Sequence, residues 1–182
     1  MRRNLFVMVT IAAITLFYSC GNSGGKSEAK SQNPANKIHQ KDDGTISLEV
    51  SKADCYSDIV NPSGNTAEWD VVISKSGRYN IWLSSATKDT TNLNYNNVVK
   101  VSVQDNRLEA RPACDKIIQN SSDVVLPYYR ADSFIGSLYI LDTGLLNIQV
   151  ISEKILPKDY KSTGPSADDS KLISVFLTPA VR

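Results

Sequence analysis

The sequence predicts an all-β sandwich, and three observations support this fold class. Apolar and polar residues alternate with period two along most of the chain from Gly44 onward, a pattern typical of strands with one buried face. Clusters of Gly, Pro, Asn, Asp and Ser separate these runs and mark turns. No window of about a dozen residues carries an amphipathic helical stripe.

The alternation predicts strands in chain order at 46–50, 67–73, 79–84, 99–103, 108–110, 138–140, 145–150 and 173–177. Turn signals lie between them at 61–64, 75–77, 105–106 and 142–144. The pair Asp105–Asn106 is short enough to form a two-residue hairpin turn. Trp69 and Tyr79 fall on the apolar phase of their strands, so we expect both in the core.

The N-terminus carries the features of a targeting segment. A basic start (residues 1–4) precedes thirteen largely apolar residues, 5–17, which are too few to cross a bilayer and fit a signal peptide. Ser19-Cys20-Gly21 then resembles the lipidation signal of bacterial lipoproteins, although Phe17 stands where that signal prefers Leu. We therefore expect a lipid on Cys20. The alternatives are an ordinary secreted protein cut near Ser19, or an uncleaved anchor.

The chain therefore divides into a signal peptide (1–19), a flexible tether (20–43) and a β-sandwich domain (44–182). The tether is rich in Gly, Ser, Lys, Asn and Gln and nearly lacks large apolar residues, so it cannot bury enough surface to fold. The expected location is a bacterial cell envelope, with the membrane contacted through the lipid. The sequence leaves open whether the domain faces the periplasm or the cell surface.

Composition excludes several classes of function. Loss of Arg2 and Arg3 with the signal peptide changes the net charge from +1 to −1, which disfavours a nucleic-acid partner. The single histidine, His39, lies in the tether, so a Cys/His nucleophile pair is excluded. No zinc spacing or phosphate loop is present. The acidic residues show no spacing that demands a glycosidase pair. We expect no cofactor and no catalytic residue.

Three segments together resemble galactose-binding-like jelly rolls. The segment 67–81 resembles their central hairpin, 144–150 with 171–179 resembles their last two strands, and 46–49 resembles their first strand. This group includes carbohydrate-binding modules of families six and thirty-five and β-sandwiches appended to bacterial glycosidases. The resemblance implies a jelly-roll β-sandwich that binds sugar. Many relatives hold a structural calcium, but Ser51 and Ser174 stand where they often have acids, so we expect no metal.

A loop at 126–132 is the first candidate binding site. In the resembled modules this region often supplies an aromatic platform, which implies that Tyr128 or Tyr129 stacks on a sugar and that Arg130 and Asp132 reach its hydroxyls. The alternative is that one tyrosine packs inward and Arg130 pairs with Asp132. The amide-rich stretch 92–97 also suits sugar hydroxyls, although such residues are common in any loop.

Trp82 is the second candidate, because it falls on the polar phase of its strand with Asn80 and Ser84. An indole there needs a ligand or a cover, and sugars stack on such faces; the alternative is a covering loop. The sequence thus favours a non-catalytic glycan-binding lipoprotein with a neutral saccharide as ligand. The competing hypothesis is a structural or protein-interaction lipoprotein of an envelope complex with no sugar ligand.

Two cysteines remain if Cys20 carries a lipid. Cys55 and Cys114 would then lie in an oxidising compartment, where one disulfide between them is possible. The alternative is a pair of thiols.

Overall fold

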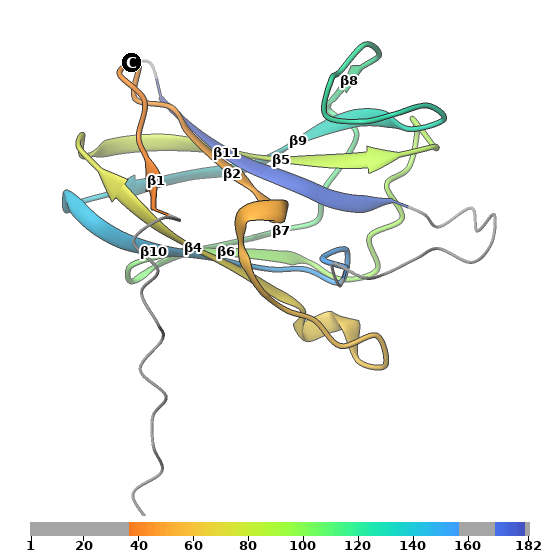
Figure 1. The fold of residues 1–182 in the computed structure, drawn as a ribbon, viewed down its shortest axis with the longest axis horizontal. Helices are drawn as coiled ribbons and strands as arrows, with labels where there is room; N and C mark the ends of the chain where they lie inside the picture. The colour runs from red at the N-terminus through yellow and green to blue at the C-terminus, as the bar shows by residue number, and fades with distance from the viewer. Residues whose placement is uncertain (1–36, 157–169, 181–182) are drawn as a thin grey trace, which may run out of the picture. The chain divides into compact units, whose positions relative to one another are not determined.

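The computed structural model describes residues 37–156 and 170–180, which form two β-sheets packed face to face (Figure 1). The first sheet, sheet A, has the order β1 (Ile38–His39), β4 (Thr66–Ile73), β10 (Gly144–Ile151), β6 (Val99–Val103), β7 (Asn106–Ala110), and β3 (Asp54–Tyr56) also pairs with β4. The second, sheet B, has the order β2 (Ile46–Glu49), β11 (Lys171–Pro179), β5 (Gly77–Thr87), β9 (Tyr129–Ile140), β8 (Lys116–Ile118). The predicted all-β sandwich is confirmed.

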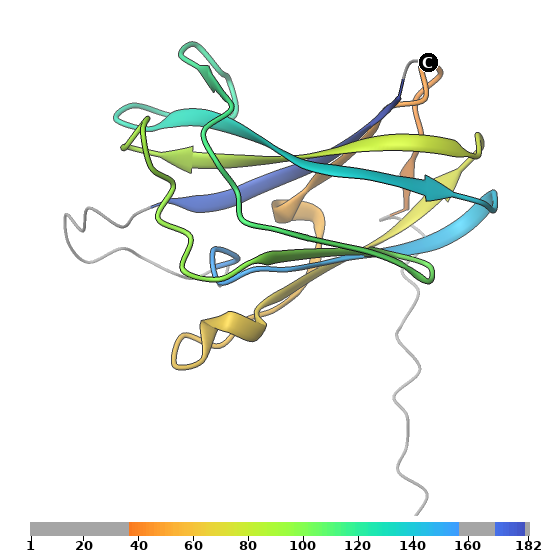
Figure 2. The same cartoon turned by 180° about the vertical axis from the view of Figure 1, so that it is seen from behind.

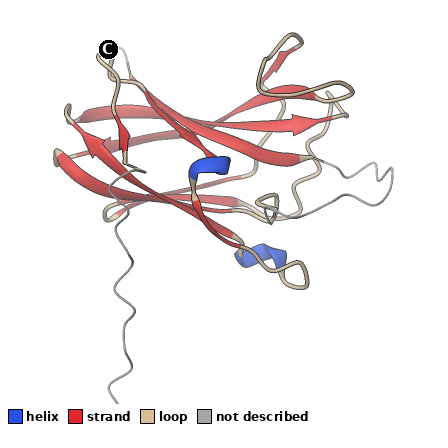
Figure 3. Ribbon diagram, viewed as in Figure 1, coloured by secondary structure: helices blue, strands red, loops and turns tan. Residues whose placement is uncertain are grey.

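Strands dominate the described residues, and the helical segments there are short 3-10 turns, η2 (Val50–Lys52) and η3 (Pro62–Gly64) (Figure 3). Every sheet pairing is antiparallel except that of β1 with β4. No helix in this part of the chain is long and apolar enough to cross a membrane.

Period-two alternation builds the core between the sheets. Strand β4 alternates strictly between buried and half-buried residues, so the side chains of Ala67, Trp69, Val71 and Ile73 face sheet B. Trp69 and Tyr79 are only 3% and 2% exposed, which confirms that both belong to the core. The indole N–H of Trp69 donates to the carbonyl of Glu49 at 2.9 Å, so a polar atom of the core is satisfied across the two layers.

The two ends of the sandwich differ. One end carries short turns, at residues 74–76, 104–105 and 141–143 (Figures 1 and 2). At the other end lie the connection 88–98 and two longer segments, 50–65 and 111–128, which include the short strands β3 and β8. We call this second end the loop end. The antiparallel pairings place the end of β5, the start of β9 and the start of β11 together there.

The structure differs from the sequence predictions at three places. The hairpin between β6 and β7 forms, but its turn is Gln104–Asp105, since Val103 pairs with Asn106. Strand β9 begins at Tyr129, so most of the predicted loop 126–132 is strand. The sandwich also includes residues assigned to the tether: β1 pairs with β4, and the Gln40 side chain bonds to the Tyr79 hydroxyl at 2.6 Å.

Cys55 and Cys114 do not form the predicted disulfide. Cys55 lies in β3 of sheet A, where its Sγ approaches the carbonyl of Val50 at 3.7 Å. Cys114 lies in the connection that leads to β8 of sheet B. Burial, followed by the charges of Asp89 and Asp115, raises the pKa of its thiol. No sheet pairing brings β3 next to the connection that carries Cys114. An oxidising compartment alone does not produce a disulfide, because the two cysteines must also lie close together in the fold.

Candidate functional site

Three aromatic side chains form a row across the outer face of sheet B. Trp82 on β5 pairs directly with Phe134 on β9 and with Phe176 on β11. The indole lies 5.1 Å from the Phe134 ring, between centroids, with the planes tilted by 54°. It lies 6.1 Å from the Phe176 ring with the planes almost parallel, at 3°. We call Phe134, Trp82 and Phe176 the aromatic row.

The strand register explains why these rings face outward. Ile81 and Leu83 flank Trp82 and are fully buried in the core, so Trp82 must point away from sheet A. A β-bulge between Ile81 and Trp82 shifts the pairing with β9 and brings Phe134 opposite the indole. Phe134 remains 45% exposed. The ring contacts of Trp82 therefore come from its two cross-strand neighbours.

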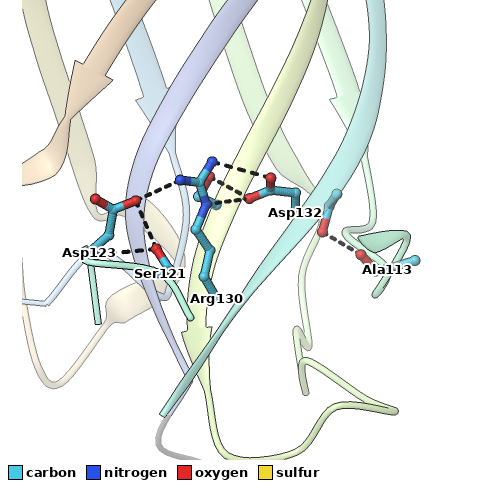
Figure 4. A network of polar contacts seen from close by, with 7 residues as sticks. Ala113, Ser121, Asp123, Arg130 and Asp132 are labelled. Carbon is cyan, nitrogen blue, oxygen red and sulfur yellow. Dashed lines mark hydrogen bonds and ion pairs between the residues drawn. The ribbon is translucent and has the colours of Figure 1, made fainter. Parts of the chain in front are cut away.

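Beside the row, Arg130 is the centre of a polar network (Figure 4). Its Nε donates to Asp132 at 2.8 Å and its Nη2 donates to the same carboxylate at 3.2 Å. Its Nη1 donates to Asp123 at 2.6 Å. Ser84 Oγ donates to Asp132 at 2.7 Å, which gives this carboxylate a further partner.

Small residues on β5 leave room for this network. In the β5–β9 pairing, Arg130 is opposite Ala86, and Asp132, the next residue on the same face of β9, is opposite Ser84. Both of these β5 side chains are small. The Arg130 guanidinium lies over the Phe176 ring on β11, 5.6 Å from its centroid, on the far side of β5. Burial lowers the pKa of Arg130. Hydrogen bonds and charge from Asp132 and Asp123 together raise it by more than burial lowers it, so the net pKa shift is upward.

A hollow of about 1120 Å³ lies where the β2 and β11 side of sheet B meets the loop end. Phe176, Tyr128 and Arg130 line one part of it. The remainder is lined by apolar side chains, among them Ile59, Leu156 and Ile173, and by polar ones, including Ser47, Glu49, Asn96, Asn97, Glu153 and Ser174. The hollow therefore combines aromatic side chains with hydrogen-bonding groups, the usual composition of a small-molecule site.

The polar wall is fixed by its own hydrogen bonds. Glu153 accepts from the backbone N–H of Asn96 and from both the backbone N–H, at 2.9 Å, and the side-chain amide of Asn97. Arg111 donates to the carbonyl of Asn96 at 3.1 Å. Burial raises the pKa of the Tyr95 hydroxyl, which is bonded to Ser85 at 2.8 Å. The amide-rich loop is thus held rigidly beside the hollow.

The structure brings together most, though not all, of the residues predicted for the site. Tyr128 lines the hollow and lies under the ammonium of Lys88, 5.0 Å from the ring centroid. Arg130 connects the hollow to the aromatic row, so the loop candidate and Trp82 belong to one continuous surface. Tyr129 lies instead on the inward phase of β9, because it shares a strand face with Ala131, two residues further on, which is fully buried. Asp132 is 4% exposed and its carboxylate is occupied by Arg130 and Ser84.

Sequence reasoning missed Phe134, Phe176 and Asp123. Phe176 carried the same signal as Trp82, since it lies between the core residues Val175 and Leu177. Phe134 lies at a bulge, which period-two counting does not detect. Among the described residues, no group of three or more His, Cys, Asp or Glu side chains is placed to hold a metal ion, and Glu49 pairs with Lys52 at 2.7 Å.

No protein family matches this sequence, and no curated protein matches it. Among solved structures, an α-L-fucosidase from Vibrio sp. strain EJY3 is similar, with a TM-score of 0.63 and 21% identity over 79% of this chain. A GH26-CBM35 β-(1,4)-mannanase from Podospora anserina gives a TM-score of 0.46 and 13% identity over 77% of this chain. The chain spans 24% of the fucosidase and 28% of the mannanase. The fucosidase similarity shows that this β-sandwich fold occurs as one region of a larger chain.

Proposed function

We propose that this chain is a non-catalytic glycan-binding lipoprotein of a bacterial cell envelope, with a galactose-binding-like jelly roll as its binding domain. The observation that carries the proposal is the hollow in which Phe176, Tyr128 and Arg130 converge. Sugar rings offer apolar C–H faces to aromatic side chains and hydroxyls to polar ones. This site provides both kinds of contact within one concavity.

Lys41, Lys154 and Lys171 also line the hollow, but the charge pairs at its Arg130 and Glu49 parts favour a neutral saccharide. Arg130 is neutralised by Asp123 and Asp132, and Glu49 is paired with Lys52. Because Arg130 and Glu49 already have oppositely charged partners, they can form hydrogen bonds with a ligand but present little net charge to it.

The proposal that the chain is not an enzyme has the same basis. Each carboxylate that lines the hollow already has partners: Asp123 pairs with Arg130, Glu49 pairs with Lys52, and Glu153 accepts from the N–H groups of Asn96 and Asn97. None of them is placed as a free acid or base.

The similarity to a region of the fucosidase supports the proposal at the level of the fold, because that protein's name describes an enzyme that acts on a sugar. Cys20 and the expected signal peptide lie outside the described residues. The proposed location in the envelope, on the periplasmic or the outer face, therefore rests on the sequence alone.

Calorimetry against a panel of neutral saccharides tests the function. Tyr128→Ala should weaken binding by about 1–2 kcal/mol if its ring stacks on the sugar. Arg130→Lys should also weaken binding, because the planar fork is lost. Tyr139→Ala is the matched control, since this tyrosine is 51% exposed on β9, far from the loop end. Binding to no saccharide, or equal binding by the Tyr128 variant, would refute the proposal.

One observation favours a second candidate function, a protein-interaction lipoprotein without a sugar ligand. Two connections at the loop end expose apolar side chains: Ile59 and Val60 are 66% and 84% exposed, and Val125 and Leu126 are 82% and 76% exposed. Exposed apolar groups concentrated at one end are typical of interaction surfaces. On this hypothesis the wild type should bind no saccharide in calorimetry, and replacing Val125 and Leu126 by Ser should abolish co-purification of an envelope partner.

A further inference from the structure

We propose that the saccharide is a chain of several sugars, which leaves the hollow at Phe176 and crosses sheet B over the aromatic row. This inference rests on the proposed function and names its ligand class. The hollow would hold one end of the chain, and Trp82 and Phe134 would carry the following units.

Continuity between the hollow and the row is the first observation. Phe176 belongs to both, since it lines the hollow and lies against Trp82, 6.1 Å between ring centroids. The row then continues for a further 5.1 Å to Phe134. These separations together are comparable to the length of a disaccharide. A single sugar in the hollow would leave Trp82 and Phe134 without a role in binding.

The residues on either side of the row are the second observation. On one side, Ser137 Oγ donates to Asn80 Oδ1 at 2.6 Å, and Thr178 is paired with Asn80 on the next strand. On the other side lie Ser84, Asp132 and Arg130. An apolar strip between two polar rows matches a sugar chain, whose ring faces are apolar and whose edges carry hydroxyls.

The character of the row is the third observation. Its three members carry no titratable group, and Phe134, at the end away from the hollow, is 45% exposed. Trp82 and Phe176 are half-buried. A single exposed apolar residue needs no explanation, but three contiguous rings on an outer sheet face, one exposed and two half-buried, point to a ligand. Binding along the row is therefore expected to be insensitive to salt.

The test measures affinity against length for oligosaccharides from mannan, xylan and β-glucan, from the monosaccharide to the hexasaccharide. We expect affinity to rise with length, and Phe134→Ala to remove roughly threefold to tenfold of the hexasaccharide affinity, the worth of one stacked ring. The same variant should bind the monosaccharide as the wild type does. Tyr139→Ala, on the same strand outside the row, should bind every length normally.

A second measurement needs no variant. Trp69 is buried, so acrylamide quenching of tryptophan fluorescence reports mainly on Trp82, and the hexasaccharide should protect this indole where the monosaccharide does not. Equal affinity for all lengths, with no protection of Trp82, would overturn the chain-binding inference and leave the proposed function standing. Failure of every length to bind the wild type would instead refute the proposed function and this inference with it.

Discussion

Arg130 holds the outer face of sheet B together, and its removal is expected to destabilise the fold. The substitution Arg130→Met keeps an unbranched apolar stem but deletes the guanidinium. Asp132, whose side chain is 6% exposed, would lose the donors at 2.8 and 3.2 Å and keep Ser84 as its partner. Asp123, 47% exposed, would lose Arg130 but keep the hydrogen bond from Ser121 Oγ at 3.2 Å and remain in water.

The burial of these groups sets the magnitude. Breaking a fully buried ion pair costs about 3–5 kcal/mol, but the Arg130 side chain is 21% exposed. We therefore expect the free energy of unfolding to fall by about 2–4 kcal/mol. Asp123→Asn should cost no more than about 1 kcal/mol, as for exposed pairs. Adding Asp132→Asn to Arg130→Met should recover part of the loss, because no buried charge is then left unpaired.

Urea denaturation followed by tryptophan fluorescence measures these differences. Arg107→Met is the matched control, because Arg107 pairs with Glu109 at 2.9 Å and both side chains are about half exposed, at 50% and 47%. That variant should lose no more than about 1 kcal/mol. The account is wrong if Arg130→Met and Arg107→Met are destabilised equally, or if Asp123→Asn costs as much as Arg130→Met.

Three further predictions concern the anchor, the thiols and one glycine. Cys20→Ala should release the protein from membranes or leave an unprocessed precursor, and wild-type fractionation and migration on a gel would contradict lipidation. Alkylation of unreduced, unfolded protein followed by mass spectrometry should label both Cys55 and Cys114. In the folded protein, Cys114 should react slowly near neutral pH, because its raised pKa keeps the thiol protonated, and faster as the pH rises. Gly44→Ala should cost about 1–3 kcal/mol by urea denaturation, because Gly44 has φ +86° and an added Cβ would lie 2.7 Å from Pro179 Cγ. Gly64→Ala, with no atom within 4 Å of an added Cβ, should be near neutral, and equal losses would contradict the steric argument.

Strand identity could be predicted because it depends on local alternation. Trp69 and Tyr79 are buried as their phase predicts, and Trp82 faces outward as its phase predicts. Strand length was harder, since β9 begins at Tyr129 with residues that include Arg130, Asp132 and Ser133. Polar residues of this kind indicate a loop when they are taken alone. Their pairing with β5 supplies the stabilisation that local propensity does not.

The composition of the site depended on register, which the sequence does not contain. Trp82 could be singled out, but its neighbours Phe134 and Phe176 lie on strands that are distant in sequence. The β-bulge that aligns Phe134 with Trp82 leaves no compositional mark. The pairing of Arg130 with Asp132, one of the two alternatives for this loop, is the arrangement observed. The third member of this network, Asp123, was not foreseen because it lies seven positions before Arg130 in the chain.

The Gln40 side chain has a mechanical consequence. Its amide donates to the carbonyl of Gly44 and to the Tyr79 hydroxyl, and its oxygen accepts from Ser74 and from the backbone N–H of Lys75. With β1 paired to β4, these bonds fix the first described residues of the sandwich to the turn between β4 and β5. A force applied to the chain along the axis of β1 would act in shear on the β1–β4 pairing and the Gln40 hydrogen bonds. Several of these bonds would have to break together. The strands that carry the loop end would bear force only after these bonds fail.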